Sequence, residues 1–94
     1  LFLLAEAMIE GGVRAGLSRE TATLLTQQTV LGASELLVRD AASAGELREA
    51  VTSKGGTTAA ALQVMLQRDV PKAIEDAVVA ARDRGRELGK SQGD

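Results

Sequence analysis

The chain has 94 residues, a formal net charge of -2 and an apolar fraction of 45%, and Phe2 is its only aromatic residue. It contains no Cys and no His, which excludes disulfides, thiol and imidazole catalysis and the common zinc sites, and no other metal site is predicted. The slight negative charge and the lack of aromatic stacking platforms give no reason to expect nucleic acid or a membrane as a partner.

The first element is a predicted helix over residues 1–14. Its charged residues Glu6, Glu10 and Arg14 are four apart and form one narrow stripe, and nearly all the remaining positions are apolar. A helix that is apolar on most of its circumference must be buried on most of it. A chain this short has little material to surround such a helix, so we expect a second copy of the chain to cover it. The alternative is the central helix of a monomeric bundle.

Gly16 marks the exit from this helix, and Ser18 is a good N-cap for a second helix with Glu20 in its first turn. This second helix is predicted to run to about Val38. Ala22, Leu25, Thr29, Ala33 and Leu36 form its apolar stripe at three- and four-residue spacing.

Two capping signals and one proline divide the rest of the chain. Ser43 with Glu46 forms a capping box that predicts a short helix over residues 44–50. A further helix is predicted over residues 57–67, with Leu62, Met65 and Leu66 buried. Pro71 suits the first turn of a last helix with Asp69 as its cap, and residues 89–94 are expected to fray. No strand pattern occurs, so the predicted class is all-α with about five helices.

The segment Val51-Thr52-Ser53-Lys54-Gly55-Gly56-Thr57-Thr58 is the most irregular part of the sequence. Two glycines and three hydroxyl residues (Ser53, Thr57 and Thr58) precede the apolar run that starts at Ala59. The first N–H groups of a helix lack internal partners and favour a negative charge, so the segment is a candidate carboxylate or phosphate site. The alternative is a simple Gly-rich turn in which Thr57 caps the helix.

In chain order, these motifs resemble the C-terminal domain of pyrroline-5-carboxylate reductase over almost the whole chain. The resemblance rests on Leu1-Phe2-Leu3-Leu4-Ala5-Glu6-Ala7, Gly12-Val13-Arg14-Ala15-Gly16-Leu17-Ser18-Arg19, Gln28-Thr29-Val30-Leu31-Gly32-Ala33 and the loop from Val51 to Thr58. The family's loop often has Pro where this chain has Lys54. That departure affects local stiffness and not the anion site, because position 54 supplies neither a glycine nor a hydroxyl.

The resemblance implies a 6-phosphogluconate dehydrogenase C-terminal-like helical domain that interlocks with a second subunit. Family members reduce 1-pyrroline-5-carboxylate to proline with NADPH or NADH, the last step of proline biosynthesis, in the cytoplasm. Their dimers can assemble further into a ring of five, and an N-terminal Rossmann domain binds the dinucleotide. Residues 1–94 would be the dimerisation and substrate-binding domain. This chain has no G-x-G-x-x-G motif, so we expect a fragment that is inactive alone, binds no cofactor itself and still dimerises.

Carried over by position, the resemblance also implies roles for the loop residues. The substrate carboxylate would sit on the backbone N–H groups around Gly56, Thr57 and Thr58, with the Ser53 hydroxyl as an added donor. Val51 would pack against the substrate ring. The Thr58 hydroxyl would lie near the imine nitrogen, where it orients or protonates the substrate.

Two other functions fit the sequence. One is a free-standing helical dimerisation or interaction module without a catalytic role, in which the Gly-Gly-Thr-Thr turn is only a cap. The other is a dehydrogenase of the beta-hydroxyacid class, which uses a lysine on its helical domain. Lys54 is the only lysine in the turn.

Overall fold

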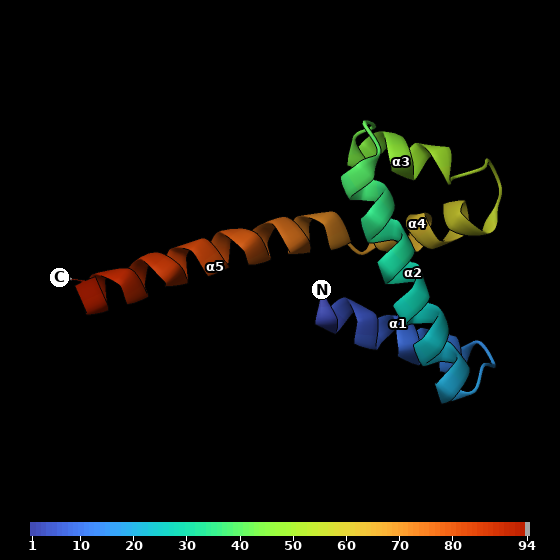
Figure 1. The fold of residues 1–94 in the computed structure, drawn as a ribbon, viewed down its shortest axis with the longest axis horizontal. Helices are drawn as coiled ribbons and strands as arrows, with labels where there is room; N and C mark the ends of the chain where they lie inside the picture. The colour runs from blue at the N-terminus through green and yellow to red at the C-terminus, as the bar shows by residue number, and fades with distance from the viewer. Residues whose placement is uncertain (94) are drawn as a thin grey trace. The chain divides into compact units, whose positions relative to one another are not determined.

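The computed structural model describes residues 1–93, with side chains described through Lys90. Five helices occupy these residues, and no strand occurs among them, which confirms the all-α class (Figure 1). The helices are α1 (Phe2–Arg14), α2 (Arg19–Arg39), α3 (Ala44–Ala50), α4 (Thr57–Gln67) and α5 (Val70–Gly93). None of them combines the length and the apolar content that a membrane span requires. The chain divides into two compact units, Leu1–Arg48 and the part from Glu49 onward.

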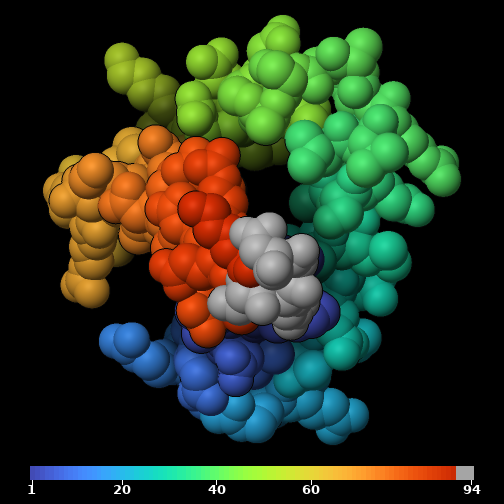
Figure 2. All heavy atoms as spheres, turned by 90° about the vertical axis from the view of Figure 1, so that its left-hand side faces the viewer, coloured from blue at the N-terminus to red at the C-terminus, as the bar shows by residue number. Residues whose placement is uncertain are grey.

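The first unit is built on the pair α1 and α2, which are in contact in the space-filling view (Figure 2). α1 ends in a Schellman motif, because the N–H of Leu17 donates to the carbonyl of Gly12 and the N–H of Gly16 to that of Val13, both at 3.0 Å. Gly16 takes a φ of 113°, a value that favours glycine. The chain then reverses, and the Ser18 hydroxyl accepts a hydrogen bond from the Thr21 N–H, as its predicted N-cap role requires.

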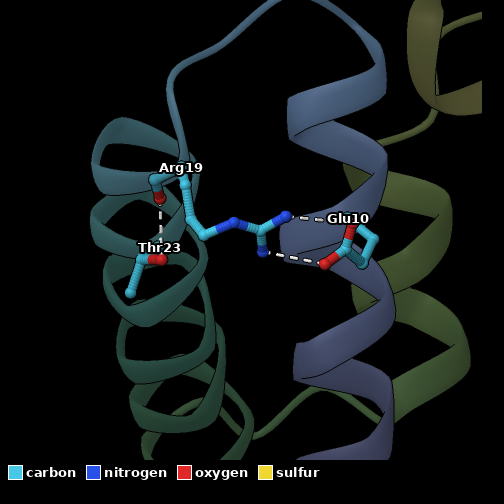
Figure 3. Close-up of polar contacts among 3 residues, drawn as sticks. All are labelled: Glu10, Arg19 and Thr23. Carbon is cyan, nitrogen blue, oxygen red and sulfur yellow. Dashed lines mark hydrogen bonds and ion pairs between the residues drawn. The ribbon is translucent and has the colours of Figure 1, made fainter.

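Two contacts tie α1 to α2. The backbones approach closely at Gly12, where a Cβ atom would lie 2.9 Å from the Cβ of Ala22. Beside this crossing, the Arg19 guanidinium donates to both carboxylate oxygens of Glu10, at 2.8 and 3.2 Å (Figure 3). This paired hydrogen bond lowers the pKa of Glu10 from its ordinary value and raises that of Arg19, and the attraction between the charges acts in the same direction. The Thr23 hydroxyl donates to the Arg19 carbonyl in the same turn.

The predicted capping box at the start of α3 is confirmed. The Ser43 N–H donates to Glu46 Oε1 at 3.0 Å, and the Glu46 N–H donates to Ser43 Oγ at 3.2 Å. The backbone hydrogen bond from Ser43 is the main reason that the pKa of Glu46 is lowered, and the contact with the Ser43 side chain adds to it.

In the second unit, α4 and α5 contact each other near the point where the two helices join, and they run from this junction in opposite directions (Figure 1). Asp69 links them with a φ of 55°, an unusual value that Asp tolerates better than most residues. Its carbonyl accepts a hydrogen bond from the Ala73 N–H in the first turn of α5. α5 extends through Gly89, where fraying was expected to begin, and reaches Gly93. A glycine inside a helix costs only about 1 kcal/mol and no proline follows, so nothing forces the helix to end at Gly89. Asp94 lies outside the described residues.

Very little of the chain is buried. Among the described side chains only Ala22 and Thr26 are buried, at 2% and 6% exposure. Leu3 and Leu4 of α1 are 79% and 49% exposed, as expected for a helix that another chain covers. Met65 and Leu66, predicted to be buried on α4, are 37% and 62% exposed, and Leu62 is half-buried. The sequence identified an apolar face there, but the second unit does not itself cover that face.

Candidate functional site

The loop between α3 and α4 forms a tight turn that leads directly into a helix. The Gly56 N–H donates to the Ser53 carbonyl at 2.9 Å, which closes a four-residue turn over residues 53–56. Gly55 occupies the third position with a φ of 75°, the value that a type II turn requires there. The second glycine is also needed, because a Cβ at position 56 would lie 2.6 Å from Ser53 Oγ and 3.2 Å from the Ser53 carbonyl oxygen. The turn therefore folds the Ser53 hydroxyl back toward the start of α4.

The start of α4 leaves backbone donors free. Gly56 is its N-cap, with a φ of -85° and a ψ of -177°, and no side chain caps the helix. The Gly56 carbonyl accepts the first helical hydrogen bond, from the Ala60 N–H at 3.1 Å. In the described part of the chain, no hydrogen bond uses the amide N–H of Thr57, Thr58 or Ala59. Three adjacent donors at the positive end of a helix form a backbone setting that suits a carboxylate or phosphate.

Three of the loop residues singled out from the sequence meet at this turn, but one of the expected backbone donors is not free. Ser53, Thr57 and Thr58 surround the start of α4, and Thr58 is half-buried while Ser53 and Thr57 are exposed. The Gly56 N–H, expected to bind the carboxylate, is already used by the turn. The amide of Ala59 is a further free donor that the sequence reasoning missed, although the third position of a helix always presents such a group.

The alternative reading of Thr57 as a side-chain cap is wrong. Thr57 is the first helical residue, and the N-cap position before it is occupied by Gly56, which has no side chain to cap with. The turn and the helix start thus form without consuming the threonine hydroxyls in a cap. Val51, at the end of α3, is 60% exposed, and its predicted role against a substrate ring stays a prediction.

The chemistry available at this loop is binding and orientation. Lys54 is the only ionisable residue between Glu49 and Arg68. The loop therefore offers backbone amides, hydroxyls and one exposed ammonium group, and no carboxylate or imidazole for acid–base work. Among the described residues, no group of His, Cys, Asp or Glu is placed to hold a metal ion.

Comparison with known proteins gives a consistent family match. The sequence model of the family described as pyrroline-5-carboxylate reductase dimerisation matches residues 1–88. The chain is 44% identical over 91 residues to the pyrroline-5-carboxylate reductase of Arabidopsis thaliana, a match that covers 97% of this chain and 33% of the relative. It is 42% identical over 92 residues to the enzyme of Pseudomonas aeruginosa, covering 98% of this chain and 34% of that protein.

Solved structures agree with these sequence matches. The pyrroline carboxylate reductase of Plasmodium falciparum, solved with NADP bound, is similar with a TM-score of 0.88 and 31% identity, covering 94% of this chain and 35% of that one. The enzyme of Coxiella burnetii is similar with a TM-score of 0.86 and 42% identity, covering 93% and 32%. The chain thus spans about a third of the length of the proteins it matches.

Proposed function

The chain belongs to the pyrroline-5-carboxylate reductase dimerisation family, and we propose that it is the C-terminal, substrate-binding domain of an enzyme that reduces 1-pyrroline-5-carboxylate to L-proline. The observation that carries the proposal is the loop between α3 and α4. It leaves the amides of Thr57, Thr58 and Ala59 free at a helix start and folds the Ser53 hydroxyl toward them. The carboxylate of the imine is the anion that these donors bind.

Within this proposal the loop binds and orients the imine. Hydrogen bonds from backbone amides to a carboxylate fix the substrate at one end. The Thr58 hydroxyl faces the imine nitrogen and fixes the ring, and the proton comes either from this hydroxyl or from water. A hydroxyl is a weak acid, so the main contribution of the loop is positioning, which can supply a large share of a rate enhancement.

The dinucleotide is not held by this chain. The described residues contain no strand, and the sequence has no glycine fingerprint, so they do not fit the family's dinucleotide site. We assign NADPH or NADH to an N-terminal Rossmann domain outside these 94 residues, in keeping with the NADP-bound relative from Plasmodium falciparum. Hydride transfer is the chemistry of that cofactor.

The exposed apolar surface of α1 supports a homodimer as the working form, and the family's dimerisation domain gives the same expectation. We extend the proposal to a cytoplasmic enzyme whose dimers assemble into a ring of five. The alternative function is a helical interaction module without catalysis.

The test uses the protein that carries this chain. Ser53→Ala and Thr58→Ala each remove one donor, and Thr29→Ala on α2 is the matched control. Loss of one hydrogen bond to a charged group costs about 1.5–3 kcal/mol, so the Michaelis constant for the imine should rise about tenfold or more for Ser53→Ala. Thr58→Ala should raise the Michaelis constant or lower turnover. If both variants reduce the imine as the parent does, the loop takes no part in the reaction, and a purely interacting role for this chain is favoured.

A second variant tests whether the turn sets the position of the hydroxyl. Gly56→Ala places a Cβ 2.6 Å from Ser53 Oγ, which is closer than van der Waals contact allows, so this hydroxyl must move away. Gly56→Ala should therefore raise the Michaelis constant as Ser53→Ala does, and the double variant should add little to either change. Fully additive effects would mean that Ser53 and Gly56 act independently.

A further inference from the structure

One residue of the second unit has an unusual backbone conformation, and it lies between two helices. Only Arg68 and Asp69 separate α4 from α5. Among the described residues other than glycine, Asp69 alone has a positive φ, at 55°. Arg68, with a φ of -99° and a ψ of 14°, lies outside this left-handed region. The break between the two helices (Figure 1) is therefore located at Asp69.

The N–H and the carbonyl of Asp69 are bound to different helices. The N–H donates to the Leu66 carbonyl in the last turn of α4, at 3.2 Å. The carbonyl accepts a hydrogen bond from the Ala73 N–H in the first turn of α5, at 3.0 Å. The two rotatable backbone bonds of Asp69 lie between these anchored groups. A rotation about either bond therefore turns α4 relative to α5, so Asp69 is the joint between the two helices.

Little else in this unit determines the direction of α4. No residue of α4 is buried, so side-chain packing within the unit does not hold the helix in place. The ring of Pro71 fixes its own φ and restricts Val70 before it, so the first turn of α5 does not absorb a rotation. No described hydrogen bond or ion pair uses the Asp69 carboxylate. The direction of α4 therefore depends on the backbone conformation of Asp69.

The free amides lie at the other end of α4 from this joint. α4 has 11 residues and is about 16 Å long, so a rotation of about 4° at Asp69 would move the amides of Thr57 and Thr58 by about 1 Å. A misplacement of this size in an active site can cost about a hundredfold in rate. A small change in the conformation of Asp69 is therefore large enough to matter at the loop between α3 and α4.

We propose that Asp69 is a positioning residue for the reduction of the imine, because its left-handed conformation sets the direction of α4 and thereby the place of the loop between α3 and α4. The inference rests on the proposed function, since it requires this loop to bind the imine. Asp enters the left-handed region more readily than most residues, whereas its Cβ excludes much of the positive-φ space that is open to glycine. Asp69 thus makes a narrower joint than a glycine would.

Three substitutions at position 69, in the protein that carries this chain, test the joint. Asp69→Asn removes the charge but keeps a residue that tolerates a positive φ, so the Michaelis constant for the imine should stay at the parent value. Asp69→Gly widens the joint and should raise this constant several-fold. The Michaelis constant for the dinucleotide, which we assign to another domain, should not change. Asp69→Ala disfavours a φ of 55° and should raise the constant for the imine further.

Glu75→Gly is the matched control. It also replaces an exposed acidic residue of the second unit by glycine, but position 75 lies inside α5 and away from the joint. Glu75→Gly should lower the midpoint of thermal unfolding, as glycine in a helix does, and leave the Michaelis constant for the imine unchanged. If Asp69→Ala does not fold, the comparison of Asp69→Gly with Glu75→Gly still decides the question.

The outcomes separate this inference from the proposed function. If Ser53→Ala and Thr58→Ala leave the reaction unchanged, the loop does not bind the imine, and this inference fails together with the proposed function. If those two variants act but Asp69→Gly keeps the parent value for the imine, only the joint is overturned.

Three further results also overturn the joint. If Asp69→Asn acts as strongly as Asp69→Gly, the charge matters and not the backbone conformation. If Glu75→Gly raises the Michaelis constant for the imine equally, lost stability explains both variants. If Asp69→Gly raises the Michaelis constants for the imine and the dinucleotide alike, the change is a general loosening of the protein and not a displacement of the loop.

Discussion

The α1–α2 pair and the α4–α5 pair differ in how much of their stability they carry themselves. Both buried residues, Ala22 and Thr26, belong to α2, and the bidentate ion pair between Glu10 and Arg19 joins α1 to α2. In the second unit, the described ion pairs lie within α5, and no described side chain is buried. Yet the candidate substrate loop leads into α4. The unit that we expect to position the substrate therefore buries less of its own side chains than the unit built on α1 and α2.

The largest expected effect comes from a charge on the apolar stripe of α5, the face that carries Val70, Ile74, Ala77, Val78, Ala81 and Leu88. Ile74→Asp should dissociate the dimer, because an unpaired charge buried at an interface costs about 3–5 kcal/mol, or a hundredfold or more in the dissociation constant. Light scattering over a micromolar concentration series measures the dissociation constant. The imine reductase activity of the protein should fall as the dimer dissociates.

Val79→Asp is the matched control, because it introduces the same charge on α5 away from the apolar stripe. Val79 is 47% exposed, close to the 56% of Ile74, so exposure alone does not distinguish the two sites. Val79→Asp should leave the dimer in place. If both variants dissociate equally, the stripe is not the buried face and the contrast between the two units loses its explanation.

The next effect concerns the close approach of α1 and α2 at Gly12. Gly12→Ala places a Cβ 2.9 Å from Ala22 Cβ, whereas a Cβ at Gly11 meets nothing within 4 Å. Both changes gain about 0.5–1 kcal/mol of helix propensity, but overpacking should cost Gly12→Ala about 1–3 kcal/mol. Thermal unfolding followed by circular dichroism should therefore rank Gly11→Ala above Gly12→Ala. Equal midpoints would mean that α1 and α2 separate at no cost.

Local signals in the sequence predicted the elements well. The helix starts at Ser18 and Ser43 were predictable because each cap uses residues within three positions of one another. The Gly-rich turn was recognisable for the same reason. The sequence offered no firm end for α5, because Gly89 permits a helix to end but does not force it to do so, and α5 reaches Gly93. The helix boundaries that could be predicted from the sequence are therefore those set by hydrogen bonds between residues close together in the chain.

Two features were harder to predict: how the apolar faces pack, and which backbone N–H groups at the start of α4 are free. The sequence showed which face of α4 is apolar, but it did not show that the second unit leaves Leu66 exposed. It placed the candidate anion-binding amides near Gly56, but whether that N–H closes the turn or stays free depends on backbone angles that composition does not determine. The helix start after the turn was predicted correctly, whereas the individual free donors became visible only in three dimensions.

A smaller effect is expected at the turn before α4. Lys54 occupies the second position of the turn, where proline is favoured, and among the described residues no hydrogen bond uses its N–H. Lys54→Pro should stabilise the protein by about 0.4–1 kcal/mol, because the unfolded chain loses freedom while the turn is kept. Urea unfolding measures this change, and the Michaelis constant for the imine should stay near that of the parent. A destabilised Lys54→Pro variant would contradict the type II geometry.

The smallest effect is the pH dependence of the link between α1 and α2. Because Arg19 lowers the pKa of Glu10 in the folded protein, the stabilisation is fully present above the ordinary glutamate pKa and is lost as the pH falls through the lowered value. Glu10→Gln should therefore lower the unfolding temperature slightly at pH 7 and leave it unchanged at a pH below the pKa of the folded carboxyl. Both side chains are 60% exposed, so added salt should shrink the difference at pH 7. A difference that persists in acid would show that Glu10 acts through packing and not through its charge, and α1 and α2 would then be joined by packing both at Glu10 and at the Gly12 crossing.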